Sequence, residues 1–224
     1  MNADVRTLLD RVAGLGGFFG LPDAGAEAWP ESHQYTAAEL YEGDGWPVIA
    51  DRTGTRLGGD RRVLLSVAQL GYLARLLSPI LGAAVVAGKA LVIPPGALVV
   101  RQTAAGGLRL ALGEGARLDG LEKLSHAITD LHLTPLTARL RHALAPTLQA
   151  GNAASALAGA VKVLPPGLRP EGARLLAELL ARPPLAGAFT APGLRRTCCL
   201  FLKLPGGGAC GDCPVPARSV VPGL

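Results

Sequence analysis

The segment VLLSVAQLGYLARLLSPILGAAVV, residues 63–86, is long and almost continuously apolar. Its length and composition predict a single long helix. We expect a bend at Ser78-Pro79, because proline lacks a backbone donor and clashes with the preceding turn. Gln69, Arg75 and Pro79 interrupt the apolar run, so we expect a helix of a protein core rather than one that spans a bilayer.

Less regular elements are expected before this helix. Residues 3–14 predict a short amphipathic helix with its apolar side chains on one face, namely Val5, Leu8, Leu9 and Val12. Residues 22–61 read as loop-rich, with one small helix near residues 36–41.

After the long helix the pattern first changes to strands. Alternating apolar residues at 97–103 and 107–112 predict a β-hairpin whose core-facing side chains are Leu108, Leu110 and Leu112. Leu91–Ile93 is expected to add a third strand.

The helical pattern returns at Leu118. Thr134-Pro135 predicts a helix start with threonine as the N-cap and proline at the first helical position. Two further helices are expected over residues 152–163 and 169–181, each followed by a Pro-Pro pair.

Composition supports one globular body. The 224 residues are 49% hydrophobic and only 4% aromatic, and the packing residues are mainly alanine and leucine. Such side chains favour closely spaced helices over a β-sandwich. We therefore expect an α+β fold, with a predominantly α-helical body and a small antiparallel β-sheet over residues 1–190 and an irregular segment over residues 191–224.

All the cysteines lie in that last segment, within RRTCCLFLKLPGGGACGDCP, residues 195–214. They are Cys198, Cys199, Cys210 and Cys213, and four thiolates are the number that a closed tetrahedral or two-iron site requires. Two residues separate Cys210 from Cys213, so a tight turn aims both sulfurs at one metal. We expect Gly211 to take backbone angles that a side chain would forbid.

Three chemistries compete for these thiols. Disulfides need an oxidising compartment, but the N-terminus shows no signal-peptide pattern, so we expect a cytoplasmic location. A zinc site usually has a second two-to-four-residue knuckle, whereas here the other half is the adjacent pair Cys198-Cys199, ten residues before Cys210. Side chains of neighbours in an extended chain point to opposite faces. Either the backbone turns at the pair, or the wider two-iron core is the target, and the spacing favours two irons.

The flanking residues suit an anionic cluster. Arg195, Arg196 and Lys203 are candidate cations that tune its potential, and the glycines at 206–208 let the backbone approach the sulfurs. The alternative is that the arginines only solvate the start of a strand and the glycines only form a surface turn.

The cysteine segment resembles the C-terminal signature of the FhuF-type ferric-siderophore reductases. The resemblance rests on Arg-Arg-Thr-Cys-Cys, on Pro-Gly-Gly-Gly and on Cys-Gly-Asp-Cys-Pro, with ten residues between the inner cysteines. A weaker similarity lies at residues 148–155, LQAGNAAS. The resemblance implies that a [2Fe-2S] cluster is bound by its four ligands Cys198, Cys199, Cys210 and Cys213.

From this we expect an enzyme of iron homeostasis, a cytoplasmic ferric-siderophore reductase. One electron would convert the bound ferric ion to ferrous and so release it from the siderophore. No nicotinamide or flavin motif is found, so we expect a separate electron donor such as a ferredoxin or a flavoprotein. Two alternatives are a non-catalytic iron–sulfur electron carrier or redox sensor, and a zinc-stabilised interaction module.

Other candidate sites are weaker. The net charge of +5 suits an anionic redox partner, an acidic chelate or the inner membrane surface, but the basic residues do not interleave with aromatics, so we do not expect nucleic-acid binding. A basic cluster flanks Gly58-Gly59 and is a candidate docking surface, although a solvated loop is the simpler reading; it consists of Arg52, Arg56, Arg61 and Arg62. The four histidines are expected at the surface or at caps; they are His33, His126, His132 and His142.

Overall fold

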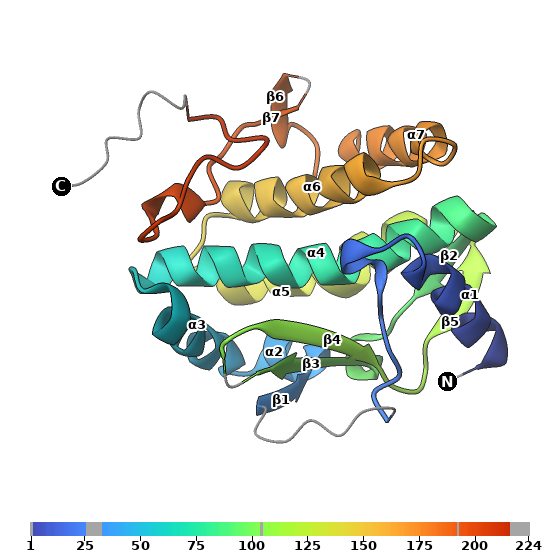
Figure 1. The fold of residues 1–224 in the computed structure, drawn as a ribbon, viewed down its shortest axis with the longest axis horizontal. Coiled ribbons are helices and arrows are strands. Elements are labelled where there is room, and N and C mark those ends of the chain that lie inside the picture. Colours follow the sequence, from blue (N-terminus) through green and yellow to red (C-terminus); the bar gives the residue numbers. More distant parts are fainter. Residues whose placement is uncertain (1, 26–32, 104, 192, 216–224) are drawn as a thin grey trace.

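The long helix lies at the centre of the molecule. The computed structural model describes residues 2–25, 33–103, 105–191 and 193–215. Helix α4 spans Arg61–Ala87; the Asp60 side chain caps its start by accepting from the Arg62 N–H, and Gly88 ends it in the left-handed conformation. The helix continues through Pro79. Helix α6 lies along one side of α4, and the β1-β3-β4 sheet lies on the other (Figure 1).

Burial, not interruption, makes α4 a core helix. By length and composition its 27 residues would suffice to cross a membrane. Our prediction that Gln69, Arg75 and Pro79 make the segment too polar and too interrupted to do so is therefore wrong. Most of that apolar stretch, 61%, is buried against the rest of the chain. Such burial is what a central helix of a globular body shows.

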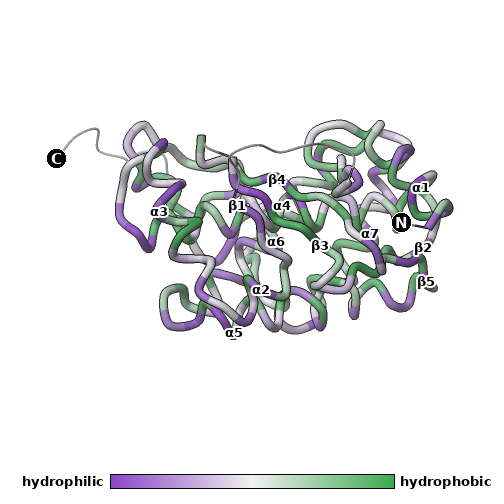
Figure 2. Tube along the Cα trace, turned by 90° about the horizontal axis from the view of Figure 1, so that it is seen from below, coloured by the Kyte–Doolittle hydropathy of each residue, from purple (hydrophilic) through white to green (hydrophobic). Residues whose placement is uncertain are grey.

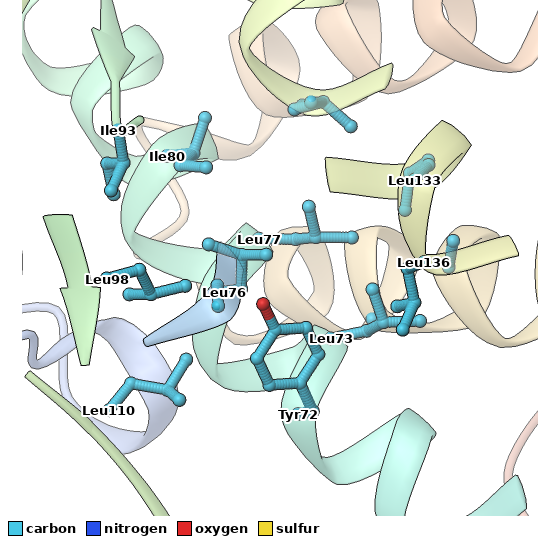
Figure 3. Packing of buried hydrophobic residues seen from close by; sticks show 14 of the residues in the cluster. Tyr72, Leu73, Leu76, Leu77, Ile80, Ile93, Leu98, Leu110, Leu133 and Leu136 are labelled. Carbon is cyan, nitrogen blue, oxygen red and sulfur yellow. The ribbon is translucent and has the colours of Figure 1, made fainter. Parts of the chain in front are cut away.

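The core forms around the C-terminal half of α4. Figure 3 shows Leu73, Leu76, Leu77 and Ile80 of this helix among side chains from several other elements, namely Ile93, Leu98, Leu110, Leu133 and Leu136. All of these residues are almost completely buried. Each such leucine or isoleucine stabilises the fold by about 2 kcal/mol relative to an exposed side chain.

The β-hairpin forms as predicted. Strand β3 (Leu98–Gln102) pairs antiparallel with β4 (Leu108–Leu112), and the three alternating leucines of β4 are buried. Ala104, in the connection, lies outside the described residues. The third strand of this sheet is β1 (His33–Thr36), which pairs with β3.

The segment at Leu91–Ile93 has a different partner from the one expected. Strand β2 (Lys89–Val92) pairs antiparallel with β5 (Arg117–Gly120) in a separate two-stranded sheet, and the 3₁₀ turn η2 (Pro95–Ala97) leads from it to β3. Helix therefore returns at Leu121 and not at Leu118. A local pattern identifies a strand, but its partner is chosen by the tertiary fold.

The N-terminal region is more regular than predicted. Helix α1 (Ala3–Ala13) buries the four apolar side chains expected and is followed by η1 (Gly17–Phe19). Helix α2 (Ala37–Glu42) starts with a capping box between Thr36 and Glu39. Helix α3 (Gly45–Leu57) was not expected, because Pro47, the initial Gly45 and the internal Gly54 weaken its propensity. Its burial of Trp46, Ile49 and Ala50 decides the conformation. Residues 26–32 lie outside the described part.

The helices that follow β5 differ from prediction mainly at their starts. After the 3₁₀ turn η3 (Leu121–Lys123), the π-helix η4 (His126–Leu133) runs directly into α5 (Thr134–Leu140). Thr134 is already helical and makes no capping hydrogen bond, so the predicted cap is wrong. Helix α6 (Pro146–Val163) begins six residues before the expected start, and α7 (Arg169–Leu180) agrees with prediction.

The C-terminal segment packs against the N-terminal ends of α4 and α6 (Figure 1). It contains a short hairpin of β6 (Phe189–Ala191) and β7 (Leu194–Arg195), followed by η5 (Phe201–Lys203) and otherwise irregular chain. Figure 2 shows hydrophobic residues gathered in the interior around β3 and α4.

The predicted α+β class, with a helical body and small antiparallel sheets, is confirmed. The division into 1–190 and 191–224 stays a prediction, and residues 216–224 lie outside the described part.

Candidate metal centre

The backbone turns at the cysteine pair. Leu200, the residue after Cys199, has a φ of 68° and is the one non-glycine residue of the described chain in the left-handed region. A branched side chain there costs on the order of 1 kcal/mol or more, and such strain concentrates at functional sites. The turn brings the Leu200 N–H to 3.2 Å from Cys198 Sγ, to which it donates. The adjacent cysteines are therefore not part of an extended strand.

The four thiols form two pairs. Cys199 Sγ lies 3.8 Å from Cys210 Sγ, and Cys213 is the knuckle thiol that acts electrostatically on Cys198 and helps to raise its pKa. Two sulfurs bound to one tetrahedral metal ion at about 2.3 Å each lie about 3.8 Å apart. The Cys199–Cys210 spacing therefore already suits two ligands of a single ion. Each pair joins one cysteine of the doublet to one cysteine of the Cys210–Cys213 knuckle.

A tight turn sets the knuckle, as predicted, but glycine is not what permits it. The Cys213 N–H donates to the Cys210 carbonyl at 3.0 Å. Gly211 is outside the left-handed region, and a Cβ added there would meet open space, so the expected role of Gly211 is wrong. The conformational requirement lies in the preceding glycines. Gly206 has a φ of 70°, and a Cβ on Gly207 would lie 2.1 Å from the Phe201 carbonyl oxygen.

Arg195 is buried among the thiols. Its side chain is completely inaccessible, and Nη2 donates to Cys210 Sγ at 2.6 Å. Its Nε lies 3.1 Å from Asp212 Oδ1, an ion-pair distance without the alignment of a hydrogen bond. Burial alone would lower the pKa of this guanidinium, but the nearby Cys199, Asp212 and Cys210 raise it overall. Arg195 therefore stays a cation in contact with the site.

Arg196 and Lys203 are placed differently. The side chain of Arg196 is exposed, and its Nε donates to the Gly187 carbonyl at 2.8 Å. Lys203 is exposed on η5. Within the described residues, no hydrogen bond joins either side chain to a thiol. Of the three predicted cations, the structure brings only Arg195 into contact with the cysteines.

A buried polar network fixes Arg195 and the doublet to the two long helices. From α4, Ser66 Oγ donates to the Cys199 carbonyl at 2.7 Å. From α6, Asn152 Oδ1 accepts from Arg195 Nη1 at 3.2 Å, while its Nδ2 donates to the Ser66 carbonyl and to Gln69 Oε1. Because these groups are buried, each hydrogen bond avoids a substantial desolvation cost. The site is thus held by residues 43 to 133 positions away in sequence.

The sequence contained a signal for this network that we did not interpret. Ser66 and Gln69 lie three residues apart in an apolar helix, and so do Gln149 and Asn152. That spacing places each pair on one helix face. Gln69 Nε2 donates to Gln149 Oε1 at 2.8 Å across the α4–α6 contact. Asn152 belongs to the weakly family-like segment at 148–155, whose role the sequence did not indicate.

Burial makes the free thiols poor acids. It raises the pKa of Cys210 to about 12; the neighbouring Cys199 adds to this effect and Arg195 opposes it. Burial also raises the pKa of Cys198, although the Leu200 N–H works in the other direction. Thiolate ligands must be deprotonated, so metal binding at this site releases protons.

The remaining predictions concern arginines and histidines. In the basic cluster, Arg52 donates to the Thr103 carbonyl and Arg61 pairs with Asp51, while Arg56 and Arg62 are exposed, so its role as a docking surface stays a prediction. The intervening Gly58-Gly59 turn contacts Leu204 and Pro205 of the cysteine segment. Of the histidines, His132 is completely buried, which contradicts the expected surface position.

The donor set fits an iron–sulfur centre. Four thiols in two pairs, a buried cation and a backbone N–H directed at sulfur are the features that hold and tune such a cluster. Among the described residues, no group of three or more histidine, cysteine or acidic side chains lies close enough together to hold a metal ion without rearrangement. The class defined by this site is an iron–sulfur protein.

The comparison with known families gives the same class. The model of the FhuF 2Fe-2S C-terminal domain matches residues 195–214, which include all four cysteines. Among curated proteins, none matches the chain. The predicted resemblance and the [2Fe-2S] cofactor are confirmed, and the match implies an iron–sulfur oxidoreductase.

Proposed function

We propose that the protein reduces ferric siderophores by one electron and so releases ferrous iron. The observation that carries this proposal is the match of residues 195–214 to the FhuF 2Fe-2S C-terminal domain at the place where the four thiols come together. Three of these thiols are half-buried and only Cys199 is fully buried. A cluster held by them lies near the surface, where a chelate can approach.

The reaction needs little from the protein besides the electron. When bound, the [2Fe-2S] cluster stores and gives up one electron at a time. Siderophores hold the ferric ion through hard oxygen donors, and the larger, less charged ferrous ion is bound far more weakly. The protein's own residues therefore have to hold the cluster, tune its potential and dock the chelate.

A cavity lined by Arg196, two residues before Cys198, is the candidate docking site. It has a volume of about 350 Å³, and its walls come from α5, α6 and the segment before β6, with Arg196 at one side; the lining includes Thr137, Pro146, Thr147, Ala150 and Gly187. The residues that line it include one cation and no acid. The Thr197 hydroxyl donates to the Thr147 carbonyl at 3.2 Å and joins this wall to Cys198. We propose that an anionic ferric chelate binds here beside Arg196.

The source of the electron is part of the same proposal. One cluster accepts one electron and cannot accept a hydride, so a separate donor, a ferredoxin or a flavoprotein, delivers it. The net charge of +5 suits an acidic donor and also suits transient contact with the inner membrane surface. We place the reaction in the cytoplasm.

The direct test uses the protein reduced anaerobically with dithionite. Addition of a ferric hydroxamate or catecholate siderophore should restore the visible spectrum of the oxidised cluster, while a ferrous-specific chelator traps one iron per cluster. The matched gallium(III) siderophore, which has the same shape but cannot be reduced, should leave the cluster reduced.

Arg196→Gln should raise the KM for an anionic chelate by up to about fivefold, because one exposed charge contact is worth up to roughly 1 kcal/mol. If no ferric chelate reoxidises the cluster, the protein is an electron carrier or a redox sensor. A colourless, zinc-containing protein that takes up no cluster would instead be a zinc-stabilised interaction module.

A further inference from the structure

The two thiol pairs have different electrostatic surroundings. The Cys199–Cys210 pair lies against the buried guanidinium of Arg195, which donates to Cys210 Sγ at 2.6 Å and also interacts with Cys199. Cys198, of the other pair, accepts from the Leu200 N–H at 3.2 Å. One pair thus faces a full positive charge and the other a backbone dipole.

The cation cannot move away from its pair. Asn152 Oδ1 accepts from Nη1, Asp212 Oδ1 lies 3.1 Å from Nε, and the Arg195 N–H donates to the Asp212 carbonyl at 3.0 Å. Asn152 is itself held by Ser66 and Gln69 of α4. A buried charge acts on its neighbours much more strongly than an exposed one.

Arg196 provides a natural contrast in the next position. It carries the same charge, but it is exposed and turned towards Gly187. Successive side chains of extended backbone point to opposite sides. One arginine of the pair therefore enters the metal centre while the other lines the neighbouring cavity.

We propose that Arg195 makes the two irons of the cluster inequivalent. In the loaded protein, Cys199 and Cys210 would hold one iron and Cys198 and Cys213 the other, and Arg195 would favour the ferrous state at the first. When a reductant such as dithionite supplies one electron, one ferric ion becomes ferrous, and no bond to the protein forms or breaks. The added negative charge is most stable at the iron whose thiolates face the guanidinium. Arg195 acts through the thiolates and is a positioning and tuning residue.

The first test is a potentiometric titration of the cluster without any chelate. Arg195→Gln should lower the equilibrium constant for reduction at least about tenfold, which is 59 mV for a one-electron couple. Arg196→Gln removes the same charge one residue away and should change the equilibrium constant for reduction much less. Asp212→Asn removes the anion that offsets Arg195, so the potential should rise.

Opposite shifts from Arg195→Gln and Asp212→Asn separate tuning from a structural role, because simple damage to the site would not change sign. The second test compares serine ligands. The harder alkoxide of serine stabilises ferric iron, so Cys210→Ser should lower the potential more than Cys213→Ser.

Equal shifts in the two arginine variants, or a larger effect of Cys213→Ser, would overturn the inference. Where Arg195→Gln does not assemble a cluster, Asp212→Asn and the two serine variants still decide it. The inference rests on the cluster and not on the acceptor. If the potentiometric test contradicts the role of Arg195, the proposed reduction of ferric chelates is still open. If no chelate is reduced, the measured cluster potentials still test the role of Arg195.

Discussion

At the scale of single residues, the site depends on unusual backbone conformations more than on unusual side chains. Leu200 occupies the left-handed region, and its N–H is thereby directed to Cys198 Sγ. Gly207 comes so close to the Phe201 carbonyl that a side chain has no room. These two positions shape the loop that carries the doublet towards the knuckle.

A matched pair of glycine variants tests this claim. Gly207→Ala places a Cβ 2.1 Å from the Phe201 carbonyl oxygen, whereas a Cβ on Gly208 meets nothing within 4 Å. The first variant should lose about 1–3 kcal/mol of stability through overpacking and hold less iron per chain. Gly208→Ala should bind iron like the natural protein. Iron content and visible absorbance per chain measure both. Equal iron content in the two variants would show that cluster binding does not depend on the close approach of Gly207 to the Phe201 carbonyl.

At the scale of elements, α4 has two functions that its apolar sequence does not separate. Its C-terminal half builds the core with leucines, and its first turns support the metal centre through Ser66. A second buried serine in the same helix, Ser78, donates only to the Ala74 carbonyl of its own helix. The two hydroxyls are alike in burial and differ in what they hold.

Replacement of each serine by alanine separates these functions. Ser66→Ala leaves the buried Cys199 carbonyl without this donor and should lower the free energy of unfolding by about 1–3 kcal/mol. It should also speed the transfer of iron to an added chelator. Ser78→Ala removes only a bond within the helix and should be close to neutral. Denaturant unfolding and the rate of iron loss report the two effects. If both variants lost iron equally fast, Ser66 would have no special hold on the doublet.

At the scale of the whole molecule, a directed chain of hydrogen bonds crosses the core. His132 Nε2 donates to the Ile93 carbonyl at 2.9 Å, so its Nδ1 is free to accept from the Tyr41 hydroxyl at 2.8 Å. Tyr72 then donates to the Tyr41 oxygen at 2.6 Å. The chain joins α2, α4, η4 and the end of β2, and it requires a neutral imidazole.

This chain makes stability depend on pH. Burial lowers the pKa of His132 to about 4, while the Ile93 carbonyl opposes the shift. The unfolded chain, with a histidine pKa of about 6.5, binds more protons in this range. The stabilisation is therefore complete above about pH 6.5 and is lost as the pH falls towards 4. Between pH 8 and pH 5 the loss should be about 2 kcal/mol.

Comparison with His132→Gln isolates this contribution, because other acid-sensitive groups are common to both proteins. Denaturant unfolding at several pH values should give curves that converge as the pH falls. Parallel curves would mean that His132 titrates alike in the folded and unfolded chains.

Much of the architecture followed from local patterns. The 3.6-residue and two-residue periodicities identified α1, α4, α7 and the β3–β4 hairpin. Helix α3 was missed because its glycines and proline argue against a helix that burial nevertheless stabilises. The predicted Thr134 cap failed because the preceding residues continue as a π-helix. Propensity is weak wherever a tertiary contact opposes it.

The sequence by itself limited the centre to a four-thiolate metal site and favoured two irons over zinc, because the number, type and spacing of the four cysteines restrict the metal chemistry before any folding is considered. Only the tertiary structure decided how the centre is built. It buries Arg195 and exposes Arg196, and it leaves room for a side chain at Gly211 but none at Gly207. It also brings Asn152 to Arg195, 43 residues later in the chain. Ligand identity is a property of residue type, whereas burial, pairing and charge at a sulfur arise from packing between distant segments.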